Sequence, residues 1–461
     1  MPINTPTPFK SVKRNIVTRI SFYTFSLALL CASAKPAQGQ SVHVSSLDSL
    51  FQEAAARNIL QGSVLVSYQD KVVYKKAFGK ASAEYGIRND VNTKYKLASL
   101  SKTFTAVIIM QLVQEGKLSV TDVISDHLDW YPKNIGYFVN IQNLMRMTSG
   151  IQNYTSFYNF TEDIMPVDFK VKDYIMNYCT TGLLFQPGSD SFDYSNSNYY
   201  ILGAIIESVT GKSFADVVQE RIFDPLGMDH SGYYLNTGIY KNMATGYSVE
   251  PVREVAAYYD QSSAYSTGGL YSTVEDMYKF DQGLYSNKFL LKKYRDEIFT
   301  NPYPANPNSW GYAWEFITDS IVYKSGNITG FRTVFLRNLS NHTSIVILNN
   351  TDNSNSTGQN ILVGILKILA GGYFASAPPP QQDISILMVD IIRKKNVDAA
   401  ISAYLKISGH PVEAARWMIN DTELLTVGQY LLTNHNNVGA QKIYALLARE
   451  FPNSNYATFK K

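Results

Sequence analysis

The hydrophobic pattern of the first part of the chain predicts a helix, a β-hairpin and a second, buried helix. From 47 to 57 the apolar residues fall on one helical stripe, made of Leu47, Leu50, Phe51 and Ala54. Two runs rich in β-branched residues, 63–68 and 72–78, are separated by three polar residues and predict the hairpin. The stretch from Ser99 to Gln114 is largely apolar and contains neither Gly nor Pro, so it predicts a buried helix.

The middle of the chain is mainly helical in pattern, and strands follow it. Between about 118 and 247 we expect helices and loops, including an apolar helix from Asn198 to Val209 that Gly211 ends. After Trp310 the pattern predicts four strands, at 310–317, 320–323, 331–337 and 343–348, and a closing helix at 360–370. Periodicity alone thus predicts a mixed α and β domain.

The C-terminal residues form a separate region. Residues 375–382 contain Pro378-Pro379-Pro380 and predict a stiff linker, and the remaining residues, 383–461, have a helical pattern. Residues 424–452 resemble one tetratricopeptide-type helix pair. A single pair cannot bury its apolar face alone. The tail therefore packs on the preceding domain or on another copy of the chain, or it binds a peptide; the sequence leaves these alternatives open.

The N-terminal residues resemble a secretory signal peptide. Four basic residues precede a short apolar run from Ile20 to Leu30, and Ala32-Ser33-Ala34 follows as a cleavage sequence. We assign residues 1–39 to this signal and expect a periplasmic or secreted protein without a stable membrane span after cleavage. A retained N-terminal anchor is the alternative. A lipid anchor at Cys31 is disfavoured because Leu30 precedes it, where a small residue is needed.

Charge and composition change this picture little. The chain of 461 residues has a net charge of +3, and removing the five basic residues of the signal leaves −2. No polyanion-binding surface is implied, so nucleic acid is not an expected partner.

Only Cys179 remains after cleavage, which leaves no pair for an intramolecular disulfide. A glycosylation sequon at Asn327 would place a glycan beside one of the chemical motifs described next, which favours a bacterial source.

Three short motifs carry the candidate chemistry. They are Ser99-Leu100-Ser101-Lys102, Tyr194-Ser195-Asn196 and Lys324-Ser325-Gly326. The first places a hydroxyl and an amine one helical turn apart. A serine needs an adjacent base to become a good nucleophile, and a buried lysine beside other cations can be that base. Each motif alone is weak and could be structural, but the three in this order form a specific signal.

At these residues the chain resembles the serine beta-lactamase and penicillin-binding family. The tyrosine motif narrows the resemblance to the branch of class C beta-lactamases, D-alanyl-D-alanine carboxypeptidases, D-amino-acid peptidases and related esterases. Sequence segments that flank the motifs are also similar to this branch, among them Phe185-Gln186-Pro187-Gly188 and Gly268-Gly269-Leu270-Tyr271-Ser272-Thr273. The resemblance covers about 47–371 and excludes the tail.

The resemblance implies a fold and a domain plan. We expect an α/β (α+β) domain of the beta-lactamase and transpeptidase type at 40–374, with an antiparallel sheet flanked by helices and an all-helical insert at about 118–247. The serine motif should lie at the seam between the two parts. The tyrosine motif should face it from the insert, and the lysine motif should lie on a neighbouring strand.

The resemblance also implies a role for each site residue. Ser99 is expected to be the nucleophile, while Lys102 and Tyr194 accept and return its proton. Lys324 is expected to lower the pKa of Tyr194 and to suit a substrate carboxylate. Substrate binding is assigned to Asn196, Ser325, Gly326 and Asn327, and the backbone N–H groups of Ser99 and Asn327 should form the oxyanion hole.

Other hydrolase classes find no support in the sequence. It contains no Gly-x-Ser-x-Gly elbow, which argues against an α/β-hydrolase. Its six histidines are scattered, so neither a zinc site nor any cofactor is expected.

Two function classes remain. The first is an exported serine hydrolase that forms an acyl-enzyme with a peptide, ester or beta-lactam substrate. The second is a catalytically idle relative that binds peptides or cell-wall fragments, with the tail as a docking surface for a protein partner or a second copy. The motifs do not separate D-peptidase, esterase and beta-lactamase activities.

Overall fold

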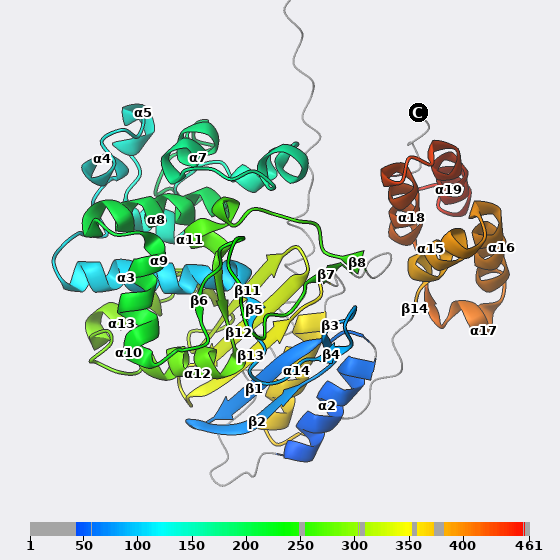
Figure 1. Ribbon diagram of the computed structural model, residues 1–461, viewed down its shortest axis with the longest axis horizontal. Helices are drawn as coiled ribbons and strands as arrows, with labels where there is room; N and C mark the ends of the chain where they lie inside the picture. Colours follow the sequence, from blue (N-terminus) through cyan, green and yellow to red (C-terminus); the bar gives the residue numbers. More distant parts are fainter. Residues whose placement is uncertain are drawn as a thin grey trace, which may run out of the picture.

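The structure is a computed structural model that describes residues 43–56, 58–248, 254–302, 304, 309–352, 357–372, 382–454 and 456. At its centre lies an antiparallel sheet in the order β10-β11-β12-β13-β1-β2 (Figure 1). The six strands are β1 (Gly62–Tyr68), β2 (Lys71–Ala77), β10 (Glu315–Phe316), β11 (Ile321–Ile328), β12 (Phe331–Asn338) and β13 (Thr343–Asn349). Because β1 pairs with β13, strands from both ends of the domain lie side by side.

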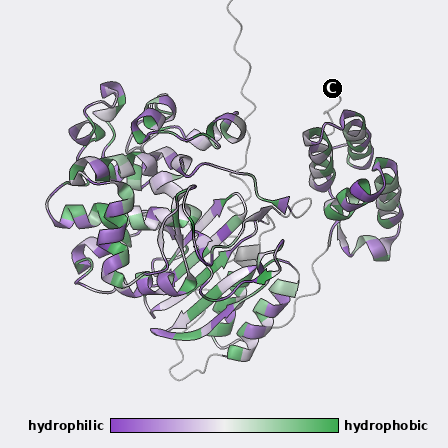
Figure 2. Ribbon diagram, in the orientation of Figure 1, coloured by the Kyte–Doolittle hydropathy of each residue, from purple (hydrophilic) through white to green (hydrophobic). Residues whose placement is uncertain are grey.

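Two helices from the two ends of the domain cover one face of this sheet. They are α2 (Val44–Ala56) and α14 (Thr357–Leu369). The stripe expected on α2 is the buried one, made of Leu47, Leu50, Phe51 and Ala54. These residues share a core with Ile361, Leu362, Ile365 and Ile368 of α14. The alternation of polar and apolar residues along α2 is visible in Figure 2.

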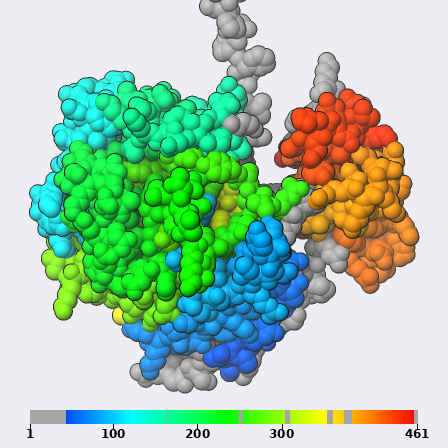
Figure 3. Space-filling view, viewed as in Figure 1, coloured from blue at the N-terminus to red at the C-terminus, as the bar shows by residue number. Residues whose placement is uncertain are grey.

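The opposite face of the sheet packs on a helical layer built around α3 (Ser101–Gln114). Twelve consecutive residues of α3, from Ser101 to Leu112, are buried, so this helix is enclosed on all sides. It contacts α8 (Asn196–Thr210) and α11 (Tyr265–Gly268). Gly211 ends α8 in a left-handed conformation, as the sequence predicts. Figure 3 shows the helical layer and the sheet layer as one continuous body.

Shorter elements complete the domain. The helices of the middle region are α4 (Ile124–His127), α5 (Lys133–Gly136), α6 (Ile141–Met145), α7 (Val171–Tyr178), α9 (Phe214–Val218) and α10 (Asp224–Leu226). They are followed by α12 (Val274–Gly283) and α13 (Lys292–Ile298). The small strands are β3 (Lys80–Ser82), β4 (Ile87–Arg88), β5 (Tyr95–Lys96), β6 (Gly232–Tyr233), β7 (Tyr247–Ser248), β8 (Glu254–Val255) and β9 (Leu270–Ser272).

The expected fold class is confirmed, and two of the expected elements need correction. The strand expected at 310–317 is wrong for its first part: only Glu315–Phe316 is a strand, because a tight turn bonds the Gly311 N–H to the Trp314 carbonyl. The helix expected from Ser99 begins at Ser101 instead. Ser99 lies in the preceding 3₁₀ turn, η2 (Ala98–Leu100), so the nucleophile is held just before the helix.

The tail contains two helix pairs. They are α15 (Ile384–Lys394) with α16 (Val397–Ser408), and α18 (Asp421–Thr433) with α19 (Asn437–Glu450). Their apolar faces form a core of their own, which includes Met388, Tyr404, Leu424 and Ile443. The second pair is the one expected from the sequence. The first pair supplies the neighbour that a single pair lacks.

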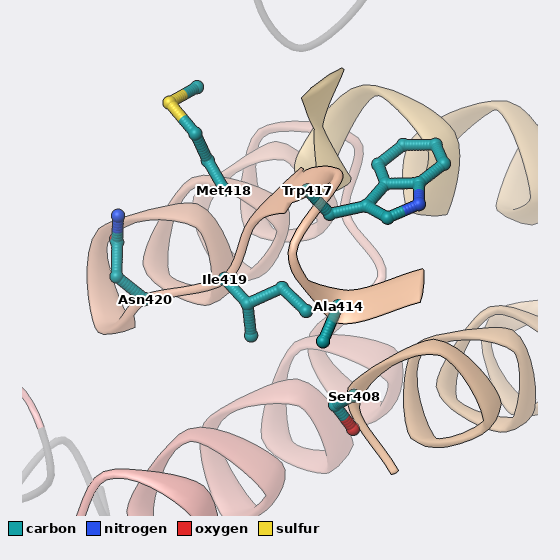
Figure 4. A pocket seen from close by; sticks show the side chains of 6 residues that line it. All are labelled: Ser408, Ala414, Trp417, Met418, Ile419 and Asn420. Atoms are coloured by element: carbon teal, nitrogen blue, oxygen red, sulfur yellow. The ribbon is translucent and has the colours of Figure 1, made fainter. Parts of the chain in front are cut away.

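A short connection joins the two helix pairs of the tail. It consists of α17 (Pro411–Ala414) and β15 (Trp417–Met418), which pairs in parallel with β14 (Gln382–Asp383). A hollow of about 450 Å³ lies beside it, lined by Ser408, Ala414, Trp417, Met418, Ile419 and Asn420 (Figure 4). Of the expected linker at 375–382, the structure describes only Gln382, which begins β14; residues 375–381 and the signal peptide expected at 1–39 lie outside the described residues. No helix in the described ranges is both long and apolar enough to span a bilayer.

We expect the tail to be dispensable for chemistry at Ser99, because it has its own core and contributes no residue to the three motifs. A chain that ends at Gly372 should still react with a fluorophosphonate at Ser99, with a rate within about threefold of the full chain. Intact-mass spectrometry measures the reaction, and a chain that ends at Tyr456 is the control. A truncated chain that is folded by circular dichroism but unreactive would show that the tail shapes the site.

Candidate active site

The three motifs meet at the seam between the sheet and the helical layer. Ser99 lies in η2, Lys102 in the first turn of α3, Tyr194 just before α8, and Lys324 on β11. Ala98, directly before the nucleophile, has a φ of 50°. This left-handed conformation costs an alanine about 1 kcal/mol. Strain of this kind is maintained where the surrounding structure fixes the backbone, and here it fixes the position of Ser99.

The Ser99 hydroxyl lies between two groups that can take its proton. Its Oγ is 3.0 Å from Lys102 Nζ and 2.9 Å from the Tyr194 hydroxyl. Both distances are hydrogen bonds of normal length. Ser99 itself is half-buried, so its oxygen can be reached by a substrate. This arrangement is the one that the resemblance implied.

Lys102 is completely buried, and three oxygens surround its amine. Besides Ser99, it donates to Asn196 Oδ1 at 2.7 Å and to the Thr267 carbonyl at 2.9 Å. The oxygens of Asn196 and Thr267 can only accept hydrogen bonds. A neutral Lys102 would therefore direct its two hydrogens to them and its lone pair to the Ser99 hydroxyl. These contacts leave the lone pair of a neutral Lys102 available to the Ser99 proton.

The electrostatics of Lys102 and Tyr194 support proton transfer near neutral pH. Burial lowers the pKa of Lys102 to about 8, and the charge of Lys324 lowers it as well, against the opposing effect of Tyr194. For Tyr194, burial alone would raise the pKa of the phenol. The positive charges of Lys102 and Lys324 outweigh burial and lower this pKa to about 8. Both groups thus titrate far below their usual ranges.

Lys324 lies beside the Tyr194 ring, in an aromatic and acidic environment. Its ammonium is 5.0 Å from the centre of the Tyr194 ring and 4.5 Å from that of Trp310. Glu315 lies 3.8 Å from the same ammonium. Burial raises the pKa of Glu315, while the charge of Lys324 lowers it. Lys324 is thus the cation expected near Tyr194, and the Glu315 carboxylate offsets part of its charge.

The strand that carries Lys324 approaches the nucleophile closely at Gly326. A Cβ atom on Gly326 would lie about 2.3 Å from both the Leu97 carbonyl and Thr333 Oγ1, and 3.1 Å from the Ser99 nitrogen. Only glycine permits this approach. The edge of β11 that faces away from β12 pairs with β10 only at Val322 and Tyr323. The rest of this edge, from Lys324 to Ile328, is not paired with β10, and β11 is in contact there with η2, the turn that holds Ser99. The substrate-binding roles of Ser325 and Asn327 remain predictions.

Two positioning residues were missed by the sequence analysis. Asn153 Oδ1 accepts hydrogen bonds from the backbone N–H and the side-chain amide of Asn196, at 3.1 and 3.3 Å. This contact turns the oxygen of Asn196 toward Lys102. Thr267 acts through its backbone carbonyl, so no side-chain pattern could reveal it. Asn153 lies outside the three motifs and the flanking segments named with them, so its role had no signal there.

Within the described ranges, no three His, Cys, Asp or Glu side chains come together in a way that could hold a metal ion.

The fold and the site define a beta-lactamase-type serine hydrolase architecture. A model of the family described as Beta-lactamase matches residues 47–369, and the chain belongs to this family. It is 30% identical over 299 residues to PbpX of Bacillus subtilis (strain 168), which covers 65% of this chain and 72% of the relative.

Solved structures agree with the family assignment. The crystal structure of a penicillin binding protein from Bacillus halodurans superposes with a TM-score of 0.60 at 25% identity, covering 68% of this chain and 98% of the other. A D-amino acid amidase from Ochrobactrum anthropi superposes with a TM-score of 0.62 at 20% identity, covering 71% and 98%. The latter likeness shows the shared fold alone.

We expect Gly326→Ala to slow acylation of Ser99 by roughly a hundredfold, because a shift of about 1 Å at the reacting groups can cost that much. The added methyl would displace β11 from the nucleophile turn. Gly268→Ala is the matched control, since its Cβ would meet its nearest neighbour, Ala264, at an ordinary 3.4 Å. Fluorophosphonate labelling rates measure both. Equal rates in the two folded variants would contradict the proposed importance of this approach.

The rate of Ser99 acylation should rise with pH as Lys102 and Tyr194 lose their protons. We expect Lys324→Met to move this rise to higher pH, by about one unit or more. Removing this positive charge raises the pKa values of Tyr194 and Lys102, so their basic forms appear only at higher pH. Lys96→Met is the control. Burial also lowers the pKa of Lys96 to about 8, but its ammonium lies over the rings of Tyr234 and Tyr259 instead. If Lys96→Met moved the rise in acylation rate and Lys324→Met did not, the proposed effect of Lys324 on Tyr194 and Lys102 would be refuted.

Proposed function

We propose that this protein is an exported serine hydrolase that cleaves an amide or ester bond through an acyl-enzyme at Ser99. The observation that carries the proposal is the position of Ser99 Oγ, within hydrogen-bond distance of both Lys102 and Tyr194. A nucleophile and its bases at these distances are the usual requirement for covalent catalysis by serine. The substrate would be a D-peptide, an ester or a beta-lactam.

The first half of the reaction uses all three groups. Ser99 Oγ attacks the substrate carbonyl carbon and forms a C–O bond while its proton passes to the Lys102 amine or the Tyr194 phenolate. The carbonyl oxygen becomes an oxyanion, which the backbone N–H groups of Ser99 and Asn327 would stabilise. A single such donor is worth about 10²–10³ in turnover. The same proton then passes to the leaving nitrogen or oxygen as its bond to carbon breaks.

The second half repeats these steps with water. A water molecule gives a proton to the same base and attacks the acyl carbon, and Ser99 leaves with that proton restored. Asn196 would orient the substrate carbonyl through its amide nitrogen, because its oxygen is engaged by Lys102. The nitrogen would exchange its 3.4 Å contact with Thr155 for the substrate and keep the one with Asn153. Ser325 would donate its hydroxyl to the substrate carboxylate or leaving group.

The surroundings of Lys324 bear on the choice of substrate. A buried ammonium favours a substrate carboxylate, but Glu315 at 3.8 Å reduces the net charge offered to it. Trp310 packs edge-on against Tyr194 and is also in contact with Phe192, whose side chain is about half exposed. This aromatic wall favours an uncharged or apolar leaving group. This preference applies to esters. We place both ester and D-peptide turnover above beta-lactam turnover, because rapid deacylation of a beta-lactam needs a specially placed water that the three motifs do not supply.

The alternative, an idle binding protein, finds less support in the geometry. A relative that had lost catalysis would not need a buried lysine whose three contacts include the nucleophile. Export is proposed from the signal-peptide pattern of residues 1–39. The tail is proposed as a module for self-association or for a protein partner, because its four helices form their own core.

We expect covalent labelling of Ser99 by a fluorophosphonate and by a labelled penicillin, identified by peptide mass spectrometry. Ser99→Ala should remain folded, lose the label, and lose turnover by about 10³-fold or more. Rates for a p-nitrophenyl ester, a D-alanyl-D-alanine peptide and nitrocefin then rank the substrates. A folded protein that neither reagent labels at Ser99 would exclude the acyl-enzyme, and fast nitrocefin turnover would reverse the ranking.

A further inference from the structure

A second cavity lies in the helical layer, apart from the Ser99 centre. Its volume is about 270 Å³, close to the lower limit for small-molecule sites. The start of α7, the middle of α8, the end of β6 and the segment 260–265 surround it; these elements are labelled in Figure 1. The catalytic residues proposed above are absent from its lining.

Aromatic rings and carboxylates dominate this cavity. Tyr200, Tyr233 and Tyr265 form much of its apolar wall, and Asp168 and Asp260 add two carboxylates. Neither lysine nor arginine is part of the lining. Tyrosine faces and carboxylates together attract cations that carry an apolar body.

The charged groups that act on Tyr233, in the wall of the cavity, are carboxylates. Burial raises the pKa of the Tyr233 phenol, and the charges of Glu207, Asp260 and Asp168 raise it further. Asp260 accepts hydrogen bonds from the Ser262 N–H and the Tyr258 hydroxyl, both of which are neutral donors. Within the described part of the chain, no lysine or arginine forms an ion pair with any of these three carboxylates.

Gln261 supplies an independent sign of a missing ligand. Gln261 is one of the residues that line the cavity and is 3% exposed, and its buried Oε1 atom has no hydrogen-bond donor. Its amide nitrogen lies close to Gly269. A buried amide oxygen without a donor costs about 1–3 kcal/mol. A ligand with N–H donors would satisfy it.

We propose that this cavity binds a small organic ammonium ion, with the ammonium between the Asp168 and Asp260 carboxylates and Gln261 Oε1, and the apolar body against the tyrosine rings. The site is distinct from the Ser99 centre but shares two elements with it. Tyr200 follows Asn196 by one turn of α8, and Tyr265 precedes Thr267 in α11. The ligand would therefore lie about one helical turn along α8 from Asn196, which accepts a hydrogen bond from Lys102.

The proposal is tested by calorimetric titration of the full chain at pH 7 with benzylamine and with benzyl alcohol, its neutral analogue. We expect benzylamine to bind at least about tenfold more tightly than the alcohol, because only the amine carries the charge and the N–H donors. Equal binding of the two probes, or no binding of the amine, would overturn the proposal.

Two variants locate the site. Asp168→Asn should weaken benzylamine binding by about fivefold. Asp173→Asn, the same change at an exposed position on α7 outside the cavity, should leave it unchanged. Gln261→Leu should also weaken binding; if it fails to fold, Asp168→Asn decides alone, since Asp168 is exposed and not in the core. Equal affinities of Asp168→Asn and Asp173→Asn would refute the assignment.

A last measurement separates this cavity from the catalytic cleft. Benzylamine binding is repeated on the Ser99→Ala chain, and on protein whose Ser99 has been blocked by a fluorophosphonate. We expect unchanged affinity in both, whether or not Ser99 proves to be a nucleophile. Loss of binding on the blocked protein would place the amine in the cleft and overturn the proposal.

Discussion

A single buried ammonium, that of Lys102, constrains the arrangement of the catalytic domain. An amine without exposure to water must be surrounded by hydrogen-bond acceptors, or burial would be prohibitively costly. Here the acceptors come from η2, α8 and α11, three elements far apart in the sequence. The sheet and the helical layer can therefore pack together only when η2, α8 and α11 all lie in these positions. The catalytic geometry is therefore also the condition under which this core can form.

The same constraint explains why the site is preorganised. The amide of Asn196 cannot rotate freely, because Asn153 holds it from the other side. The φ of Ala98 and the close approach of Gly326 fix the backbone on either side of the nucleophile. Strain and close packing at these positions are tolerated because a large, well-packed hydrophobic core surrounds them. The site consequently needs little rearrangement when a substrate arrives.

Positive charge is concentrated at the seam, whereas carboxylates line the second cavity. Lys102 and Lys324 lower the pKa of Tyr194, while the carboxylates near Tyr233 act in the opposite direction on that phenol. Both tyrosines belong to the helical layer, and their chemistry is set by their neighbours. Among the 33 tyrosines of this chain, Tyr194 is thus proposed to act as a base, whereas Tyr200, Tyr233 and Tyr265 line the second cavity.

The sequence by itself determined the local elements and the candidates for the catalytic groups. The stripe on α2, the hairpin β1–β2 and the apolar helix α8 followed from periodicity, because burial on one face dictates spacing along the chain. Ser99, Lys102, Tyr194 and Lys324 followed from motifs, since their chemistry requires these residue types. The 3₁₀ turn at Ser99 and the short strand β10 did not follow, because local hydrogen bonds there override the pattern.

Only the tertiary structure decided which distant groups meet. The Thr267 carbonyl, the Asn153 side chain and the Glu315 carboxylate contact catalytic groups from segments that carry no chemical signature of their own. A backbone carbonyl is present at every position, so its role depends entirely on where the fold places it. The pKa values of Lys102 and Tyr194 likewise arise from burial and neighbouring charge. These depend on distances through space, which the order of residues along the chain does not specify.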